Sequence, residues 1–504
     1  PRHYRRHSPD KAALIDGDTQ VSFAQLDEIS NRIANALHAS GVTPASHVGF
    51  IGKNSARYFE SLFGVSKHGC ALVPLNWRLA PPELAQVIDD SRPALVLVDR
   101  EFEPLLAAVL PLLSFTPQCI SFDGVTRSGT AFEAWLAPFS GDDPQLDVDP
   151  RQTALLMYTS GTTGRPKGAQ ISHQNLNYLR LCEHLEPALR WSADDVMLTV
   201  MPNFHLVGTG LSLQALYNGS SLSMLGALEP GQLLKLIARD RPTVCALVPT
   251  AIQMVLDHPD CASTDLSSLR LIMYAGSPIG AALLRRALSE MRCQFMQFYG
   301  ATETAGAVTL LRPEQHQIDD ERKLRSCGTP LPLIEVRIVD ASGQVLPPGQ
   351  IGEMLVRSPA LAQGYWQQPA VSAETFVDGW YHTGDVGLVD DEGLLYIVDR
   401  AKDMIVSGGE NVYSTEVEQA LAAHPAVNAC AVIGLPDSRW GEKVAAVVVR
   451  VPDADLSAEA LIQHCRTRIA GYKLPKTVVF VEALPMSPSG KILKRVLREQ
   501  LQHR

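Results

Sequence analysis

The chain has 504 residues, of which 46% are hydrophobic and 19% charged, and its formal net charge is −10. This length exceeds what one hydrophobic core usually serves, so we expect two or more domains. The composition is that of an ordinary globular protein, and the negative charge argues against a general nucleic-acid-binding protein. No apolar run approaches the roughly 18 residues that indicate a membrane-spanning helix. The nine cysteines form no C-x-x-C pair; this pattern favours a reducing, cytoplasmic compartment over disulfides or a zinc site.

The first half of the chain alternates between helix and strand patterns. Ser22, with Gln25 three residues later, has the pattern of a capping box, and apolar residues then recur at helical spacing until Gly41. Further helices are predicted over 56–67, 82–90 and 281–291, and strands over 48–51, 71–73, 94–98, 244–248 and 269–274. Such alternation predicts an α/β fold with parallel sheets covered by helices.

The pattern changes in the second half of the chain. From about Cys327, short strands over 335–339 and 352–356 are separated by turn residues, which predicts a small β-rich subdomain. After Arg400 a compact α+β unit is expected. Its predicted helices cover 416–422 and 458–469, and its predicted strands cover 427–433 and 444–451.

The most informative segment reads Y-T-S-G-T-T-G-R-P-K-G over residues 158–168. Backbone amides can approach a polyphosphate closely where no Cβ intervenes, so this loop is a candidate phosphate site. Its candidate ligands are Thr159, Ser160, Gly161, Thr162, Thr163, Gly164 and Lys167. It is not a Walker A loop, because Pro166 separates the second glycine from Lys167 and no Ser or Thr follows that lysine. A flexible Ser/Thr/Gly linker is the alternative.

This segment resembles the phosphate loop of the adenylate-forming superfamily, which contains acyl- and aryl-CoA synthetases, peptide-synthetase adenylation domains and firefly-type luciferases. The other motifs of the superfamily follow in its order from about Ser22 to Lys491. The chain is most similar to bacterial fatty acyl-CoA synthetases of the AMP-dependent synthetase and ligase family. The resemblance implies a large N-terminal AMP-binding domain over 1–401 and a small mobile C-terminal domain over 402–504, with a hinge near Lys402.

The sequence Q-F-Y-G-A-T-E-T over 297–304 resembles the Y-G-x-T-E element of the superfamily. By this resemblance Tyr299 packs against adenine, Thr302 contacts phosphate and Glu303 binds magnesium, an ion that suits a hard carboxylate oxygen. The resemblance also places Gly300, Ala301 and the strand end Gly276-Ser277-Pro278 at the ATP site. A strand end that runs into a turn with a surface glutamate is the alternative.

Three further elements are expected at the nucleotide. Tyr381–Asp385 resembles the T-G-D element, in which Asp385 accepts hydrogen bonds from the ribose hydroxyls, and Arg400 in D-R-A-K-D also reaches the ribose. Lys491 lies in a segment similar to the P-x-x-x-x-G-K element, whose lysine bridges the acyl carboxylate and the α-phosphate. Together with Thr302, Glu303 and His205, it completes the predicted catalytic set. Turn geometry and a basic tail are the alternative explanations.

The molecule that accepts the acyl group is predicted from the segment after the hinge. In acyl-CoA synthetases the loop that corresponds to Gly408, Gly409 and Glu410 lines the pantetheine tunnel after the C-terminal domain rotates. Trp440 and Lys473 are candidates for binding the nucleotide end of CoA. A Gly-Gly turn and a packing role for Trp440 are the alternatives.

The acid is predicted to meet Met201–His205, which resembles the P-x-F-H element at the acid pocket. His205 stands where amino-acid-activating domains place an aspartate, which argues against an amino-acid substrate. The expected pocket residues are Phe204, His205, Gly208, Gly210, Ala301 and Gly306. Small uncharged walls suit an apolar tail and offer no cation for a second carboxylate, so a medium- or long-chain fatty acid is favoured, with an aryl acid close behind.

The resemblance therefore implies an acid–thiol ligase that uses ATP, Mg²⁺ and coenzyme A and forms an acyl-AMP intermediate. An aryl-CoA ligase of the cinnamate or benzoate type and a stand-alone enzyme that loads a carrier protein are the alternatives. Glu303, Arg400 and Lys491 argue against a non-catalytic nucleotide sensor. The expected partners are small molecules and not nucleic acid, while peripheral membrane contact and a homodimer stay open.

Overall fold

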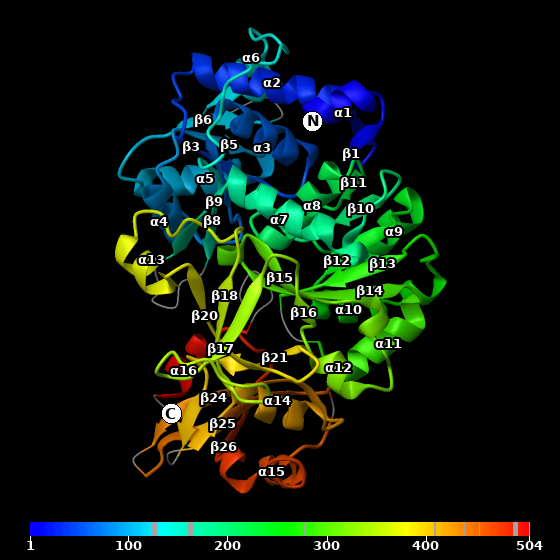
Figure 1. Cartoon of the computed structure of the whole chain (residues 1–504), viewed down its shortest axis with the longest axis vertical. Helices are drawn as coiled ribbons and strands as arrows, with labels where there is room; N and C mark the ends of the chain where they lie inside the picture. The colour runs from blue at the N-terminus through cyan, green and yellow to red at the C-terminus, as the bar shows by residue number, and fades with distance from the viewer. Residues whose placement is uncertain are drawn as a thin grey trace. The chain divides into compact units, whose positions relative to one another are not determined.

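The computed structural model describes residues 1–122, 129–159, 166–276, 279–407, 410–437, 439–452, 454–486 and 492–502 (Figure 1). The chain divides into two compact units. Unit 1 consists of Pro1–Glu335 and Val356–Tyr381, and unit 2 consists of Val336–Leu355 and His382–Arg504. In the described part of the chain, no helix combines the length and the hydropathy needed to cross a membrane.

The first sheet of unit 1 has seven strands in the order β7-β6-β5-β3-β4-β8-β9. Its strands are β3 (His47–Ile51), β4 (Ala71–Leu75), β5 (Leu95–Val98), β6 (Gln118–Ser121), β7 (Thr130–Ala131), β8 (Thr153–Thr159) and β9 (Lys167–Ser172). All neighbours are parallel except β8 and β9. The accompanying helices are α2 (Phe23–Ala39), α3 (Ala56–His68), α4 (Pro81–Ser91), α5 (Glu103–Val109), α6 (Phe132–Leu136) and α7 (His173–Leu185).

The second sheet of unit 1 has nine strands in the order β16-β15-β14-β13-β12-β10-β11-β1-β2. Its strands are β1 (Ala12–Asp16), β2 (Thr19–Ser22), β10 (Val196–Thr199), β11 (Ser221–Met224), β12 (Val244–Leu247), β13 (Leu271–Tyr274), β14 (Gln294–Ala301), β15 (Gly306–Leu311) and β16 (Thr329–Pro330). The remaining helices of unit 1 are α1 (Arg2–His7), α8 (Leu206–Tyr217), α9 (Pro230–Asp240), α10 (Pro249–Leu256), α11 (Ala281–Met291), α12 (Glu321–Arg325) and α13 (Pro369–Thr375).

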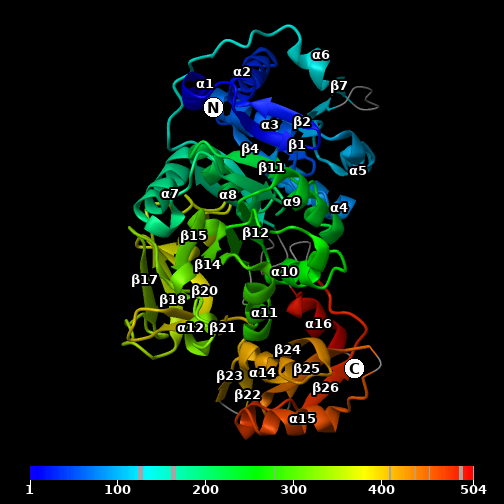
Figure 2. The same ribbon diagram turned by 90° about the vertical axis from the view of Figure 1, so that its right-hand side faces the viewer.

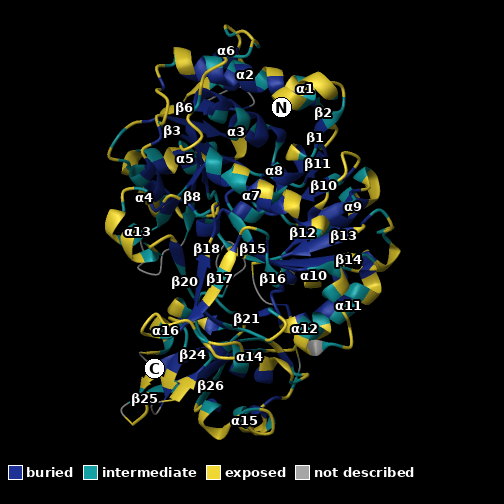
Figure 3. Cartoon of the chain, in the orientation of Figure 1, coloured by how far each residue is buried: buried dark blue, intermediate teal, exposed yellow. Residues whose placement is uncertain are grey.

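Local sequence accounts for these elements. The Ser22 hydroxyl accepts from the backbone N–H of Gln25 while the Gln25 side chain accepts from the Ser22 N–H, so the predicted capping box starts α2. Strands such as β5 are buried on both faces, which explains their continuous apolar sequence. Figure 3 shows β12, β13 and β14 as buried, while α9 and α11 carry exposed residues. The α/β fold with parallel sheets that the sequence predicted is confirmed.

The β-rich segment forms a five-stranded sheet of order β17-β18-β20-β19, in which β21 pairs with β20. Its strands are β17 (Glu335–Val339), β18 (Gly352–Arg357), β19 (Phe376–Val377), β20 (Trp380–Val389) and β21 (Leu395–Arg400). The pairing of β20 with β21 is antiparallel and sets Asp385 opposite Arg400. The small β-rich subdomain expected from about Cys327 therefore exists.

The C-terminal part of unit 2 is an α+β body around a sheet of order β23-β22-β25-β24, in which β26 pairs with β25 (Figure 2). Its elements are β22 (Ile405–Ser407), β23 (Glu410–Val412), α14 (Ser414–Ala422), β24 (Val427–Asp437), β25 (Gly441–Arg450), α15 (Ala458–Arg466), β26 (Thr477–Phe480) and α16 (Lys494–Leu501). Alternate residues of β24 face opposite sides: Val432 packs in the cluster of α14 and α15, whereas Ala431 and Ile433 pack with Leu497 of α16.

The hairpin of this body extends beyond its predicted bounds. Strands were expected over 427–433 and 444–451, but β24 continues to Asp437 and β25 begins at Gly441. The two strands pair along their length, from Val427 opposite Arg450 to Asp437 opposite Gly441. Hydrogen bonds between the paired strands therefore set the ends of these strands. The apolar sequence pattern alone does not indicate these bonds.

Candidate active site

The residues predicted to meet adenine and the acid follow neighbouring parallel strands of the nine-stranded sheet. β10, β12, β13 and β14 are consecutive in the sheet order and run parallel. Phe204 and His205 come after β10, Gly276 after β13, and Tyr299 to Ala301 end β14. Ligands of open α/β sheets bind outside the carboxyl ends of the strands. The topology thus brings these residues to one edge of the sheet.

The turn after β14 is fixed by a glycine contact. A Cβ on Gly300 would lie 2.1 Å from the carbonyl oxygen of Gly306, so only glycine fits there. The Thr304 hydroxyl accepts from the N–H of Ala301 at 3.0 Å and donates to the Gly306 carbonyl at 2.6 Å. These contacts hold the short 3-10 helix Thr302–Thr304, which carries the predicted phosphate and magnesium residues.

Glu303 is buried, and its hydrogen-bond partners among the described residues are neutral. The Tyr365 hydroxyl donates to Glu303 Oε1 at 2.7 Å, and the backbone N–H of Ala362 donates to the Glu303 carbonyl at 2.8 Å. Among the residues that the structure describes, no lysine or arginine forms an ion pair with Glu303. Burial, followed by the neighbouring Glu303 charge, raises the pKa of Tyr365, so its hydroxyl keeps the proton that it donates.

This environment fits a magnesium ion bound together with a nucleotide. The described residues contain no group of three or more His, Cys, Asp and Glu side chains that could hold a metal by themselves. Magnesium commonly takes only one or two protein carboxylates and completes its octahedron with waters and phosphate oxygens. Glu303, a buried carboxylate with only neutral described donors, is suited to supply one such oxygen.

The strands β8 and β9, which flank the predicted phosphate loop in sequence, pair with each other. Thr159 and Lys167 lie opposite each other in the antiparallel pair β8–β9, and the Thr159 hydroxyl donates to the Lys167 carbonyl at 3.5 Å. The Lys167 ammonium lies 5.1 Å from the centre of the Tyr365 ring. The predicted residues Ser160, Gly161, Thr162, Thr163, Gly164, Ser277, Pro278, Gly408, Gly409 and Lys491 lie outside the described residues.

The predicted acid-contacting rings belong to an aromatic cluster. Phe204 is buried and makes an edge contact with Trp77, with ring centres 6.1 Å apart. The Arg78 guanidinium lies 4.8 Å from the Trp77 ring and 5.8 Å from the Phe204 ring. His205 occupies the N-cap position of α8, and its ring centre is 4.8 Å from that of Phe204. Trp77 and Arg78 were not predicted from the sequence, because they are distant in sequence from this motif.

Two of the predicted pocket glycines are explained by packing. A Cβ on Gly208 would lie 2.4 Å from the Met201 carbonyl oxygen, and one on Gly306 would lie 2.6 Å from Leu179 Cδ2. At Gly210 the nearest atoms are ordinary contacts at 3.7 Å. The small size of Gly208 and Gly306 therefore follows from close contacts and gives no independent support for a wide apolar pocket.

A buried ion pair lies beside Gly210. Arg180 donates to the Gly210 carbonyl at 3.4 Å, and its guanidinium is 2.8 Å from a carboxylate oxygen of Glu183, three residues further along α7. Burial lowers the pKa of Arg180 and raises that of Glu183 to about 7, while each charge opposes the shift of its partner. Arg180 thus places a cation next to the predicted pocket residue Gly210, and this cation is paired with the Glu183 carboxylate. The only sequence signal was the i,i+3 spacing.

Asp385 and Arg400, the predicted ribose residues, are brought together in unit 2. They lie opposite each other on β20 and β21, and Arg400 Nε is 2.5 Å from Asp385 Oδ1. Asp385 is buried, and its backbone N–H donates to the Thr383 hydroxyl at 2.9 Å. Gly384, which lies between Thr383 and Asp385, has φ +67°, a value that favours glycine.

Asp399, next to Arg400, has a structural role. It is buried, and its carboxylate accepts from the backbone N–H and the hydroxyl of Ser414 at the start of α14. The Lys494 ammonium donates to the same hydroxyl at 2.6 Å and pairs with Glu418 at 2.8 Å. Burial raises the pKa of Asp399. Lys402, the predicted hinge, is exposed in the turn that follows β21.

The predicted CoA residues differ in their surroundings. Trp440 is 38% exposed, and two cations lie near its ring: the Arg439 guanidinium at 4.9 Å and the Lys476 ammonium at 5.8 Å. Lys473 instead contacts both carboxylate oxygens of Glu416 at 2.7 Å. Glu410 is exposed and pairs with Ser407 between β22 and β23. Arg439 and Lys476 were not predicted, although both are basic residues close in sequence to candidate residues.

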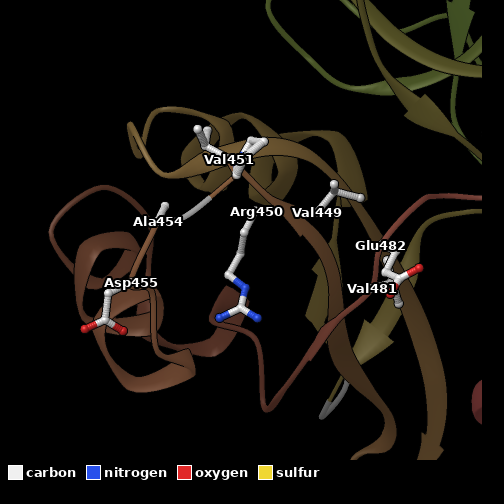
Figure 4. A pocket seen from close by; sticks show the side chains of 8 residues that line it. Val449, Arg450, Val451, Ala454, Asp455, Val481 and Glu482 are labelled. Atoms are coloured by element: carbon white, nitrogen blue, oxygen red, sulfur yellow. The ribbon is translucent and has the colours of Figure 1, made fainter.

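A pocket of about 420 Å³ lies elsewhere on unit 2. It is lined by Val449, Arg450, Val451, Pro452, Ala454, Asp455, Val481 and Glu482. Figure 4 shows the Arg450 side chain extended between Asp455 on one side and Glu482 on the other. The Arg450 guanidinium also lies 4.7 Å from the Phe480 ring. None of the predicted site residues lines this pocket.

Comparison with known proteins gives the family. Residues 2–366 match the family described as AMP-binding enzyme, and residues 416–491 match its C-terminal domain. The chain therefore belongs to the AMP-binding enzymes, and the predicted membership of the adenylate-forming superfamily is confirmed.

Similar proteins point in the same direction. A fatty acid–[acyl-carrier-protein] ligase, ScoC, of Streptomyces coeruleorubidus is 37% identical over 500 residues, which cover 99% of this chain and 95% of that protein. A feruloyl-CoA synthase of an Amycolatopsis species is 38% identical over 501 residues, which cover 99% and 98%. The solved amide bond synthetase McbA from Marinactinospora thermotolerans gives a TM-score of 0.89 at 31% identity, with 99% of each chain covered. The chain is thus a ligase of the ATP-dependent, AMP-forming acid ligase class.

Proposed function

We propose that this chain is an acyl-CoA synthetase. In the first half-reaction a carboxylate attacks the α-phosphate of ATP, which gives an acyl-AMP and releases pyrophosphate. In the second, the thiol of CoA attacks the acyl carbon and AMP leaves. The observation that carries the proposal is the set of neighbouring parallel strands in one sheet at whose ends these residues lie: His205 and Gly276 follow β10 and β13, and Tyr299 lies in the last residues of β14.

The geometry suggests how the nucleotide would be held. Tyr299 and the backbone at Gly276 would contact adenine, and Thr302 and Lys167 would contact the phosphates. The buried Asp385 carboxylate has two acceptor oxygens, which suit the vicinal hydroxyls of ribose. A magnesium ion bound at Glu303 would neutralise charge on the phosphate oxygens. Lys491 would then place its ammonium between the acid and the α-phosphate.

The surroundings of Trp440 support CoA as the acceptor. An exposed indole flanked by the cations of Arg439 and Lys476 suits the adenine and phosphate groups at the nucleotide end of CoA. A carrier protein presents only the phosphopantetheine arm and has no such nucleotide. The carrier-loading alternative is supported by the similarity to ScoC.

For the acid we propose a medium- or long-chain fatty acid. The Arg180 guanidinium beside Gly210 is already engaged by the Glu183 carboxylate, so it does not favour a second carboxylate on the substrate. The aryl alternative is supported by the similarity to a feruloyl-CoA synthase. Pocket discrimination per methylene is only about 1–3 kcal/mol, so chain length has to be measured.

The deciding experiment measures AMP release with and without CoA over saturated acids from butyrate to arachidate, with cinnamate, ferulate, benzoate and malonate included. The proposal expects CoA-dependent AMP release with the longer saturated acids. Faster turnover of cinnamate or ferulate would favour the aryl ligase. Pyrophosphate release without any CoA-dependent AMP release would favour the carrier-loading enzyme.

Lys491→Ala tests the first half-reaction separately. Removal of one pre-placed donor should slow adenylate formation, followed as pyrophosphate release, by at least ~10²–10³-fold. Thioester formation from supplied acyl-AMP should be largely spared. Equal damage to both half-reactions would contradict the role proposed for Lys491.

A further inference from the structure

The segment around Tyr365 connects two parts of the candidate ATP site in unit 1. The backbone N–H of Trp366 donates to the Gly168 carbonyl at 2.8 Å, and Tyr365 forms a β-bridge with Ala169 of β9. Three residues before Tyr365, the N–H of Ala362 donates to the carbonyl of Glu303 at 2.8 Å. One short stretch of backbone is thus bonded both to the strand that follows the phosphate loop and to the turn that carries Glu303.

The Tyr365 side chain makes the same connection. Its hydroxyl donates to Glu303 Oε1 at 2.7 Å, and its ring lies 5.1 Å from the Lys167 ammonium. Tyr365 itself is buried. A Tyr365 hydroxyl has one proton to donate, and that proton fixes one oxygen of the carboxylate.

We propose that Tyr365 is a positioning residue for the nucleotide-bound metal: it holds Glu303 so that the second carboxylate oxygen faces the ion, while its ring faces Lys167 of the phosphate loop. This inference deepens the proposed function and rests on it. Without the hydroxyl, the Glu303 carboxylate would lose its described side-chain donor and could rotate about its last bond. Metal sites lose affinity when the hydrogen bonds that orient their ligands are removed.

The test variant is Tyr365→Phe, which removes the hydroxyl and keeps the ring beside Lys167. Mn²⁺ serves as the probe, and its binding to the full-length protein is followed by electron paramagnetic resonance with a non-hydrolysable ATP analogue and no acid. We expect the Mn²⁺ dissociation constant to rise about tenfold, which corresponds to about 1.4 kcal/mol. This is close to the lower end for a hydrogen bond to a charged group.

The second readout is kinetic. The Mg²⁺ concentration that gives half-maximal pyrophosphate release should rise by a similar factor, while the KM of the acid stays unchanged. In a Glu303→Gln background the same Tyr365→Phe change should have little effect on either readout, because Tyr365 acts through that carboxylate. A merely structural role would lower the melting temperature without a shift in metal dependence.

Tyr396→Phe is the matched control, because it removes a tyrosine hydroxyl that donates to another carboxylate, Asp390, at 3.0 Å. It should leave the Mn²⁺ dissociation constant unchanged. Equal Mn²⁺ affinity of wild type and Tyr365→Phe would overturn the inference and leave the proposed function standing. If the wild type binds no Mn²⁺ with the analogue, both are overturned.

Discussion

His316 gives a prediction whose size can be worked out from the structure. Its side chain is buried, Nδ1–H donates to the Arg312 carbonyl at 2.9 Å, and Nε2 lies 3.1 Å from the Tyr274 hydroxyl, which also lies 3.3 Å from Gln297 Oε1. Burial disfavours the charged imidazolium, so the neutral imidazole is the favoured form in the folded protein at neutral pH. Burial lowers the pKa of His316 from 6.5 to about 4. We expect His316→Gln, which keeps a donor and an acceptor but does not titrate, to reduce the loss of folding stability at acidic pH.

The sign follows from which state takes up the proton first. With a folded pKa below the unfolded value, the unfolded chain is protonated first as the pH falls. The contribution of His316 to the free energy of unfolding is therefore complete above pH 6.5 and is lost as the pH falls through 4. One pKa unit corresponds to about 1.36 kcal/mol, so the loss is about 2 kcal/mol at pH ~5 and approaches about 3.4 kcal/mol below pH ~4.

The measurement is urea unfolding of wild type and His316→Gln at pH ~8 and pH ~5. Tryptophan fluorescence reports mainly on unit 1, the unit of His316, because five of the six tryptophans lie there. These are Trp77, Trp135, Trp191, Trp366 and Trp380. Other histidines titrate in both proteins, so the difference between them isolates His316. If both lose the same free energy of unfolding between the two pH values, the reasoning is refuted.

Two further predictions concern packing near the site. Gly300→Ala places a methyl group 2.1 Å from the Gly306 oxygen and should lower the free energy of unfolding by about 1–3 kcal/mol. It should also lower the affinity for ATP. Gly210→Ala is the control: its methyl group has room, so the melting temperature should not fall. Glu183→Gln leaves the buried Arg180 charge without its counter-ion and should cost about 3–5 kcal/mol in urea unfolding. A Glu183→Gln protein as stable as the wild type would show that the pair is not charged.

The sequence predicted those elements whose signals are local. The helix expected over 281–291 has the bounds of α11, and the capping box at Ser22 forms as expected. The hairpin β24–β25 was predicted too short because its ends depend on the partner strand. Propensity describes a residue's own preference, whereas ladder pairing depends on a second segment.

The same distinction applies to the site. Motifs with fixed spacing pointed to Tyr299, Glu303 and Arg400, whose roles stay predictions. Tyr365 contacts Glu303 from 62 residues away, and no spacing rule connects the two. Arg180 is a surface-type residue in sequence, and only its contact with Gly210 shows that it is buried near the candidate pocket.

The bonds between Asp399 and Ser414 bear on any movement of the C-terminal domain. They join residues on opposite sides of Lys402, so a swivel at that lysine has to pull them apart. Each is a hydrogen bond to a carboxylate, which contributes about 1.5–3 kcal/mol. A rotation at Lys402 would thus first break these two hydrogen bonds. The rearranged state would need new interactions of similar free energy to be populated.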